Sequence, residues 1–459
     1  MQQEFSSFRD PSGMIYRQDG RVRRLINQCY RPQYERLMQS GLYQRLVKAG
    51  LLVPHVELPE LPPNCDARTA YKAIEPAQVP MISYPYEWSF GQLKDAALVT
   101  LRAHRMALER DMVLKDASAY NIQQMNGRML LIDTLSFDLY TEGQLWIAYG
   151  QFCRHFLAPL CLMAYRDVRL LQLLRVYIDG VPLDLASELL QGKGGLGVRQ
   201  HIHWHARATQ KHARDGGERK PIQAMSISRF NHIAMIESLT RMVEALRLKD
   251  IQTEWGDYYD RTNYSDAASQ CKARLVAEYA RAAAPRVVWD FGANNGYYTR
   301  IAAGKDAFGV AFDIDPVAVE RNYRALRQSK EKRLLPLLLD VTNPSPGIGF
   351  AGRERTPIQA RQQPDCLLAL ALVHHLAISN NLPLGKIADW FASLAPWLII
   401  EFVPKEDSQA RTLLSTREDI FPDYTWEGFE AAFAAPYELI RSEKVEDSLR
   451  TLYLYRRRG

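Results

Sequence analysis

The chain has 459 residues, 47% of them hydrophobic and 24% charged, and a formal net charge of +6 at pH 7. This length predicts two domains, and the composition is that of an ordinary folded protein. The mild positive charge permits an acidic ligand. It lacks the dense basic signature of nucleic-acid-binding proteins, so we do not expect a nucleic-acid partner.

The six cysteines form no C-x-x-C pair and no zinc-like spacing with histidine. The amino-terminal residues contain no apolar core of a signal peptide. We therefore expect free thiols and a cytoplasmic location. The most apolar stretch, Trp146 to Ile178, is interrupted by six charged or histidine residues, which predicts buried helices and no membrane span.

The first distinctive pattern lies in the amino-terminal half. Met81 to Glu87 is predicted as a hinge strand and Leu93 to Glu109 as a long helix. Asp116 and Asn121 follow with four residues between them, and Asp133 ends a short apolar run. This order resembles the carboxyl-terminal lobe of protein kinases and of aminoglycoside-phosphotransferase-like kinases. The resemblance implies an α+β kinase-like domain that binds ATP, with Asp116 as the catalytic carboxylate and with Asn121 and Asp133 as Mg²⁺ ligands.

Several kinase features are missing from this half. No His-Arg-Asp or His-Gly-Asp triplet precedes the pattern, and Thr134-Leu135 replaces Phe-Gly. Asp10-Pro-Ser-Gly13 is a poor substitute for a glycine-rich loop, and Lys72 is a candidate for the phosphate-binding lysine. In the alternative interpretation, the Asp and Asn side chains simply cap turns. We expect weak or absent nucleotide binding.

Two segments rich in glycine and charge, 191–197 and 215–221, indicate a boundary between domains. We place it at 215–225, which divides the chain into residues 1–220 and residues 221–459. No internal repeat is present.

The second half alternates short apolar runs with longer amphipathic ones, which predicts a doubly wound, Rossmann-like parallel sheet with helices on both faces. Two short runs close together at the end predict an antiparallel hairpin at the sheet edge. The predicted strands are 286–290, 307–312, 335–339, 366–372, 397–402, 437–440 and 451–455, and the predicted helices are 297–303, 316–327 and 384–394.

The sharpest motif is the turn that follows the first of these strands. Gly292 and Gly296 come directly after Asp290, and glycine there allows a ligand to approach the backbone closely. Asp313 and Asp340 follow the next two strands. NAD is the main rival ligand, but Asn294 replaces the second glycine of its fingerprint and Asp290 would repel a pyrophosphate. A glycine turn without any ligand is the other alternative.

The run from Asp290 to Gly296 resembles motif I of class I S-adenosylmethionine (SAM)-dependent methyltransferases, in its D-x-G-A-N-x-G variant. The resemblance covers about 200 residues. It implies that Asp313 binds the ribose, with Asp315 as the alternative, and that Asp340 lies beside the adenine. The cofactor loop would include Ala293, Asn294 and Asn295, where the two asparagines depart from the commoner glycine-rich version.

On the acceptor side, the fourth strand is followed by His374 and His375. Either is a candidate general base for an oxygen or nitrogen nucleophile. The alternative is a histidine that packs on the cofactor without proton transfer. Glu401, at the end of the fifth strand, is a candidate polar group in the same cleft, or else a cap or salt-bridge residue.

The segment before the first strand is polar and aromatic, and the second domain is expected to begin with a helical lid. Tyr259, Asn263 and Tyr264 are candidate lid contacts to the cofactor, and a plain linker is the alternative. The region from Glu254 to Glu401 resembles bacterial methyltransferase-like proteins related to nodulation host-specificity proteins. We expect methyl transfer to a small molecule or a carrier-borne group. The alternatives are a bifunctional phosphotransferase–methyltransferase and a SAM-sensing pseudokinase. The sequence leaves the oligomeric state open.

Overall fold

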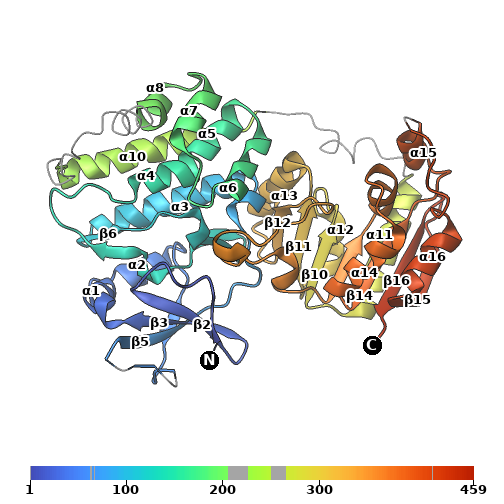
Figure 1. Cartoon of the computed structure of the whole chain (residues 1–459), viewed down its shortest axis with the longest axis horizontal. Coiled ribbons are helices and arrows are strands. Elements are labelled where there is room, and N and C mark those ends of the chain that lie inside the picture. Colours follow the sequence, from blue (N-terminus) through green and yellow to red (C-terminus); the bar gives the residue numbers. More distant parts are fainter. Residues whose placement is uncertain (1, 63–64, 67, 205–225, 250–264, 416) are drawn as a thin grey trace. The chain divides into compact units, whose positions relative to one another are not determined.

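The structure, a computed structural model, describes residues 2–62, 65–66, 68–204, 226–249, 265–415 and 417–459. It divides into two compact units (Figure 1). Unit 1 comprises Met1–Asp250 and Gly347–Thr356, and unit 2 comprises Ile251–Pro346 and Pro357–Gly459. All six cysteines carry free thiols, as expected.

Unit 1 begins with a five-stranded antiparallel sheet in the order β1-β2-β3-β5-β4. Asp19 and Gly20 both have positive φ, 53° and 72°, which suits the tight turn between β2 and β3. Figure 1 shows these strands at one end of unit 1 and most of its helices at the other. The strands are β1 (Gln2–Gln3), β2 (Gly13–Gln18), β3 (Arg21–Asn27), β4 (His55–Glu57) and β5 (Ala70–Pro76).

The long helix α3 (Phe90–Leu108) follows this sheet and forms the centre of the helical part. It starts with a capping box, in which Ser89 and Gln92 exchange hydrogen bonds between side chain and backbone. Two short antiparallel pairs follow, β6 (Met112–Leu114) with β9 (Phe137–Leu139), and β7 (Ile122–Met125) with β8 (Arg128–Leu131). The other helices are α1 (Arg31–Gln39), α2 (Leu42–Lys48), α4 (Tyr149–Phe152), α5 (Ala158–Tyr165), α6 (Leu173–Val176), α7 (Leu183–Leu190), α8 (Leu196–Val198) and α10 (Arg229–Ala245).

The apolar stretch from Trp146 is largely helical and mostly buried, as predicted. Within the described part of the chain, no helix is long and apolar enough to span a bilayer. The predicted hinge strand from Met81 to Glu87 is wrong. This segment is irregular and ends in the 3-10 turn η2 (Pro85–Glu87), because proline fixes φ and has no N–H for a strand ladder.

Two segments that we expected in the second domain belong to unit 1 instead. Helix α10 packs on α3, where Lys94 Nζ donates to the carbonyl oxygens of Glu244 and Leu246 at 2.8 Å. Residues 347–356 return to unit 1 between two strands of the second sheet. Their buried Glu354 carboxylate pairs with Arg9 at 2.6 and 2.9 Å. The compact units therefore divide at Asp250, not at 220.

Unit 2 contains a seven-stranded sheet in the order β12-β11-β10-β13-β14-β16-β15. The first five strands of this order are parallel, and β16 and β15 form the predicted antiparallel hairpin at the edge. The strands are β10 (Val287–Phe291), β11 (Phe308–Asp313), β12 (Leu334–Leu338), β13 (Cys366–Ala369), β14 (Trp397–Phe402), β15 (Tyr437–Lys444) and β16 (Thr451–Arg457). This is the doubly wound α/β fold that the alternation of apolar and amphipathic segments predicts.

Helices cover both faces of this sheet, because successive residues of a strand point to opposite sides. Val288 and Leu452 belong to the core cluster that includes α11 and α12. On the other face, Phe291 stacks on Trp390 of α14, and Tyr453 contacts Phe429 of α16. The helices are α11 (Asp266–Ala283), α12 (Tyr297–Ala303), α13 (Pro316–Ser329), α14 (Leu384–Leu394), α15 (Ser408–Leu414) and α16 (Trp426–Ala434).

Candidate active site

A cavity of about 420 Å³ opens in unit 2 at the carboxyl ends of β10, β11 and β13. In a parallel sheet these strand ends lie along one edge, where ligands bind in doubly wound folds. Seven of the residues selected from the sequence line this cavity: Asp290, Gly292, Ala293, Asn294, Asp313, Asp340 and His375.

The turn after β10 is shaped by positive φ angles. Gly292 has φ of 75° and Asn294 has φ of 50°, a conformation that glycine and asparagine adopt more readily than other residues. The backbone N–H groups of Gly292 and Ala293 both donate to the carbonyl oxygen of Phe312 at 2.9 Å. These bonds hold the turn against β11. A Cβ on Gly292 would lie 3.4 Å from Leu372 in the cavity wall.

Asp313 is the hydrogen-bonding centre of the site. One carboxylate oxygen accepts from the backbone N–H of Asn294 at 2.7 Å, and the other accepts from that of Asp315 at 2.8 Å. Asp315 instead caps α13, because its carboxylate accepts from the N–H of Val317 at 2.7 Å. Asp313 lines the cavity and Asp315 does not.

Asp290 lies fully buried beneath the turn. Its carboxylate accepts a hydrogen bond from the Thr299 hydroxyl at 2.6 Å. Burial raises the pKa of Asp290 to about 7 and that of Asp313 to about 6, although their hydrogen bonds oppose the shift. The site thus holds two carboxyl groups with raised pKa values. A cation bound beside them would lower these pKa values and favour the ionised carboxylates.

Asp340 lies two residues beyond β12 and forms a local turn. Its Oδ1 accepts from the backbone N–H of Thr342 at 2.8 Å and from the Thr342 hydroxyl at 2.7 Å. Both residues line the cavity. Asp290, Asp313 and Asp340 therefore mark three neighbouring strand ends around one space.

The two candidate histidines occupy different places. His375 lines the cavity, whereas His374 is buried behind it, and its Nδ1 has no hydrogen-bond partner among the described residues. Burial lowers the pKa of His374 well below the ordinary value and that of His375 to about 4. Both imidazoles are therefore neutral at pH 7, the form that accepts a proton.

A buried ion pair at this edge was not predicted. Lys272 Nζ of α11 donates to Glu401 Oε2 of β14 at 2.6 Å, and both side chains are almost fully buried. Lys272 also lines the cavity. A signal for it exists in the sequence, because Lys272 lies four residues after Ala268 and three before Leu275, on the apolar face of its helix. Glu401 is thus a salt-bridge residue.

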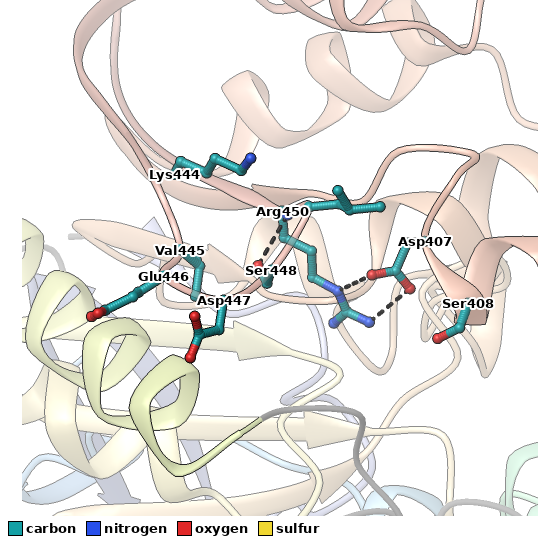
Figure 2. Close-up of a pocket in the computed structure, with 9 residues that line it drawn as sticks. Asp407, Ser408, Lys444, Val445, Glu446, Asp447, Ser448 and Arg450 are labelled. Carbon is teal, nitrogen blue, oxygen red and sulfur yellow. Dashed lines mark hydrogen bonds and ion pairs between the residues drawn. The ribbon is translucent and has the colours of Figure 1, made fainter.

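A second cavity of about 580 Å³ lies along the turn between β15 and β16 and the start of α15. Figure 2 shows Arg450 and Asp407 facing each other there, joined by two hydrogen bonds of 2.8 and 3.1 Å. Because β16 runs antiparallel to β14, this turn lies at the same sheet edge as the end of β14.

Two further predicted cofactor residues, Asn295 and Gly296, do not line the cavity. Asn295 accepts from the N–H of Tyr297 at 3.1 Å, and Gly296 caps α12 in a left-handed conformation. Tyr259, Asn263 and Tyr264 lie outside the described residues. Cavity residues that the sequence did not single out include Ser269, Lys272, Tyr298, Thr342, Ser379 and Asn380.

In unit 1, Asp116, Asn121 and Asp133 converge on one cluster. Asn121 donates to the Ser136 hydroxyl at 3.4 Å, and Ser136 donates to Asp133 at 2.8 Å. Burial and the charge of Asp133 raise the pKa of Asp116, while hydrogen bonds to groups including Asn121 oppose that shift. The four-residue spacing and the apolar run correctly indicated that these side chains meet.

The surroundings of Asp133 do not fit a Mg²⁺ site. Its Oδ1 accepts from Arg24 of β3 and from the N–H of Leu135, and its Oδ2 accepts from Ser136. These donors use most of the roughly four acceptor positions of a carboxylate. Lys72 pairs with Glu57 of the neighbouring strand β4, and its ammonium lies near the Tyr34 and Tyr71 rings. No cluster of three His, Cys, Asp or Glu ligands occurs among the described residues.

No protein-family model matches the chain. Among solved structures, the chain is similar to the N-methyltransferase NodS from Bradyrhizobium japonicum WM9 in complex with S-adenosyl-L-homocysteine (SAH), with 10% identity, 45% of this chain and 100% of that chain covered, and a TM-score of 0.31. It is also similar to the bifunctional kinase-methyltransferase WbdD, with 17% identity, coverage of 42% and 40%, and a TM-score of 0.28.

These structural scores are low, so the fold assignment rests on the strand order and on the placement of the glycine turn described above. The sequence match is far more extensive. The chain is 33% identical over 461 residues to nodulation protein NoeA from Rhizobium meliloti (strain 1021), which covers 98% of this chain and 95% of that protein. The chain therefore belongs to the NoeA family of nodulation proteins.

Proposed function

We propose that unit 2 transfers a methyl group from SAM to an oxygen or nitrogen atom of a small molecule or of a group carried on a larger one. One observation carries this proposal. The glycine turn of the motif borders a cavity into which three neighbouring strand ends bring Asp290, Asp313 and Asp340.

The charges of the cavity match SAM better than a dinucleotide. SAM carries a cationic sulfonium and an ammonium group, and Asp290 and Asp313 supply buried carboxyl groups beside the turn. A pyrophosphate at the same place would be repelled. Asp313, rather than Asp315, suits the ribose hydroxyls, because Asp315 is used to cap α13. The adenine would lie beside Asp340.

In the transfer step, the acceptor atom attacks the methyl carbon in line with the departing sulfur. The protein then contributes mainly alignment and removal of water. His375 is the better placed of the two histidines to take the proton of the acceptor, because it lines the cavity and is neutral. His374 packs behind it, with ring centroids 4.1 Å apart, and would orient it.

Calorimetry of the full chain with SAM and SAH tests cofactor binding directly. We expect binding of both, and methyl transfer from radiolabelled SAM into a fractionated cell extract. Asp313→Ala should bind SAM more weakly, and Asp365→Ala serves as the matched control because Asp365 lies at the opposite end of the sheet, where its carboxylate accepts from the N–H of Val287. Absence of SAM and SAH binding by a folded wild-type protein would refute the proposal.

A second candidate function concerns unit 1. We infer a kinase-like fold, supported by the order of elements: an antiparallel sheet, the long α3, and two short strand pairs around Asp116, Asn121 and Asp133. Arg24 already supplies a cation to Asp133, which favours a domain without phosphotransferase activity. A bifunctional phosphotransferase–methyltransferase would require ATP turnover that depends on Asp116. A SAM-sensing pseudokinase would require SAM binding without any methyl transfer.

A further inference from the structure

The amino-acid end of SAM carries a carboxylate as well as an ammonium group, so a complementary site needs a cation. Of the described residues that line the cofactor cavity, Lys272 is the one lysine or arginine. It extends from α11, whose amino-terminal half lies at the carboxyl ends of the strands, and it lines the same wall as Asp290 and Tyr298. The cavity therefore places one buried cation near the buried carboxyl group of the motif.

The neighbours of Lys272 favour its charged form. Its Nζ bonds to Glu401 at 2.6 Å and lies 4.7 Å from the centre of the Tyr298 ring. Burial lowers the pKa of Lys272, and the charges of Glu401 and Asp290 oppose this. A buried ammonium without a partner would be costly, whereas the pair with Glu401 keeps it in place before any ligand arrives.

We propose that Lys272 binds the methionine carboxylate of SAM, and that Glu401 is a positioning residue that orients and charges Lys272. This inference rests on the proposed cofactor. An ammonium group has three donors, so Lys272 can bind a carboxylate while it keeps its bond to Glu401. Asp290 carries the opposite charge to Lys272 and would face the ammonium group at the same amino-acid end of SAM.

Arg450 is the competing cation at this edge of the sheet. Its guanidinium makes two hydrogen bonds to the buried Asp407 carboxylate (Figure 2), and it lines the second cavity instead of the cofactor cavity. His375, which does line the cofactor cavity, is neutral at pH 7. Lys272 is thus the group whose charge and position both fit.

The test compares two ligands that differ only in the carboxylate: SAH and decarboxylated SAH, which keeps the adenosine, the thioether and the amine. Calorimetry with the full chain should give tighter binding of SAH by the wild type. Lys272→Met keeps most of the length of the side chain and removes its charge. We expect it to weaken SAH binding by about tenfold to a hundredfold, the range for a charge-assisted bond, with decarboxylated SAH changed by less than about twofold.

Lys386→Met is the matched control, because Lys386 is exposed on α14 and lies outside the cavity. Lys272→Met leaves Glu401 buried without its partner, so the double variant Lys272→Met/Glu401→Gln, which buries no unpaired charge, guards against misfolding. It should show the same loss of preference for SAH, and thermal unfolding reports whether each variant is folded.

A folded double variant that keeps the wild-type preference for SAH would overturn the inference, as would loss of the preference in Arg450→Met but not in the Lys272 variants. Equal binding of the two ligands by the wild type would overturn it while leaving the proposed cofactor intact. Binding of neither ligand would overturn the proposed function, and this inference with it.

Discussion

The two acidic residues at the end of β11, Asp313 and Asp315, give the most discriminating prediction. Both are buried and lie two residues apart, yet the structure gives them different tasks. Asp313 lines the cavity and accepts two backbone N–H groups, and Asp315 caps α13. Replacing each by alanine in turn therefore separates cofactor binding from helix capping.

The two substitutions should change different quantities: Asp313→Ala the affinity for SAM, and Asp315→Ala the free energy of unfolding. If Asp313 accepts the ribose hydroxyls, its loss removes hydrogen bonds to an ionised acceptor, which contribute about 1.5–3 kcal/mol. SAM affinity should fall by about tenfold to a hundredfold. Asp315→Ala should lower the free energy of unfolding by about 0.5–2 kcal/mol through the lost cap, with little change in SAM affinity.

Calorimetric titration with SAM at pH 8 and urea unfolding of the same samples measure the two effects. At this pH the Asp313 carboxyl is ionised, since its pKa is about 6. Asp313→Ala also removes the bonds to the N–H groups of Asn294 and Asp315, so some loss of stability accompanies its loss of affinity. The reasoning is refuted if Asp315→Ala weakens SAM binding as much as Asp313→Ala does.

Further predictions concern the glycine turn, Asp290 and Asp116. Gly292→Val should abolish measurable SAM binding in calorimetry, because a β-branched residue is strained at φ of 75° and its side chain would enter the cavity; unchanged affinity would remove the turn from the site. SAM affinity should rise from pH 5.5 to 8 as Asp290, with a pKa of about 7, ionises, and Asp290→Asn should flatten this profile. In thermal unfolding, the ligand-free protein should lose stability as pH rises from about 4 to 7, because the folded state holds a proton that the unfolded chain, with a carboxyl pKa near 3.8, has released. Asp116→Ala should leave methyl transfer unchanged in the radiolabel assay, and ATP turnover that requires Asp116 would favour the bifunctional protein instead.

The sheet of unit 2 was predictable because its signals are local. Apolar runs of four to seven residues separated by amphipathic segments give strands and helices directly, and three elements match their predicted bounds: α12, α14 and β14. The end of β13 was placed too late, at Leu372, because the apolar run continues past Ala369 into the loop. Apolar residues that line a cavity carry the same signal as those in a strand.

The glycine turn was likewise predictable, since its glycines and Asp290 lie within seven consecutive residues. Ion pairs between residues that are distant in sequence were not predictable. Lys272 and Glu401 are 129 residues apart, and Arg450 and Asp407 are 43 apart. Nothing local distinguishes an acid that meets a buried lysine from an acid that caps a helix. The unexpected lysine on the apolar face of α11 gave half of the signal, but not its partner.

The predicted boundary at 215–225 differs from the division of the compact units at Asp250 for a related reason. Glycine and charge near 191–221 indicated an exposed connection, but a boundary depends on which core a segment packs against. Residues 347–356 lie between β12 and β13 in sequence, yet Phe350 stacks against Phe5 and Glu354 pairs with Arg9. A segment this short, between two elements of one fold, carries no composition that separates it from an ordinary loop.

The cluster in unit 1 was found from its spacing, but its electrostatic balance depends on a strand more than a hundred residues away in sequence. The convergence of Asp116, Asn121 and Asp133 leaves two carboxyl groups close together, and each raises the cost of ionising the other. A kinase offsets that repulsion with Mg²⁺ and phosphate. Here Arg24 provides the compensating charge from within the chain, so the cluster remains stable without Mg²⁺ or phosphate.

The presence of the acidic residues is therefore not evidence of phosphoryl transfer, and Arg24→Met is the variant that distinguishes a structural cluster from a metal site. In a structural cluster this change leaves Asp133 buried without its cation and lowers the unfolding temperature, and added Mg²⁺ and ATP do not restore it. Restoration by Mg²⁺ and ATP would instead establish a metal site that Arg24 occupies only in their absence.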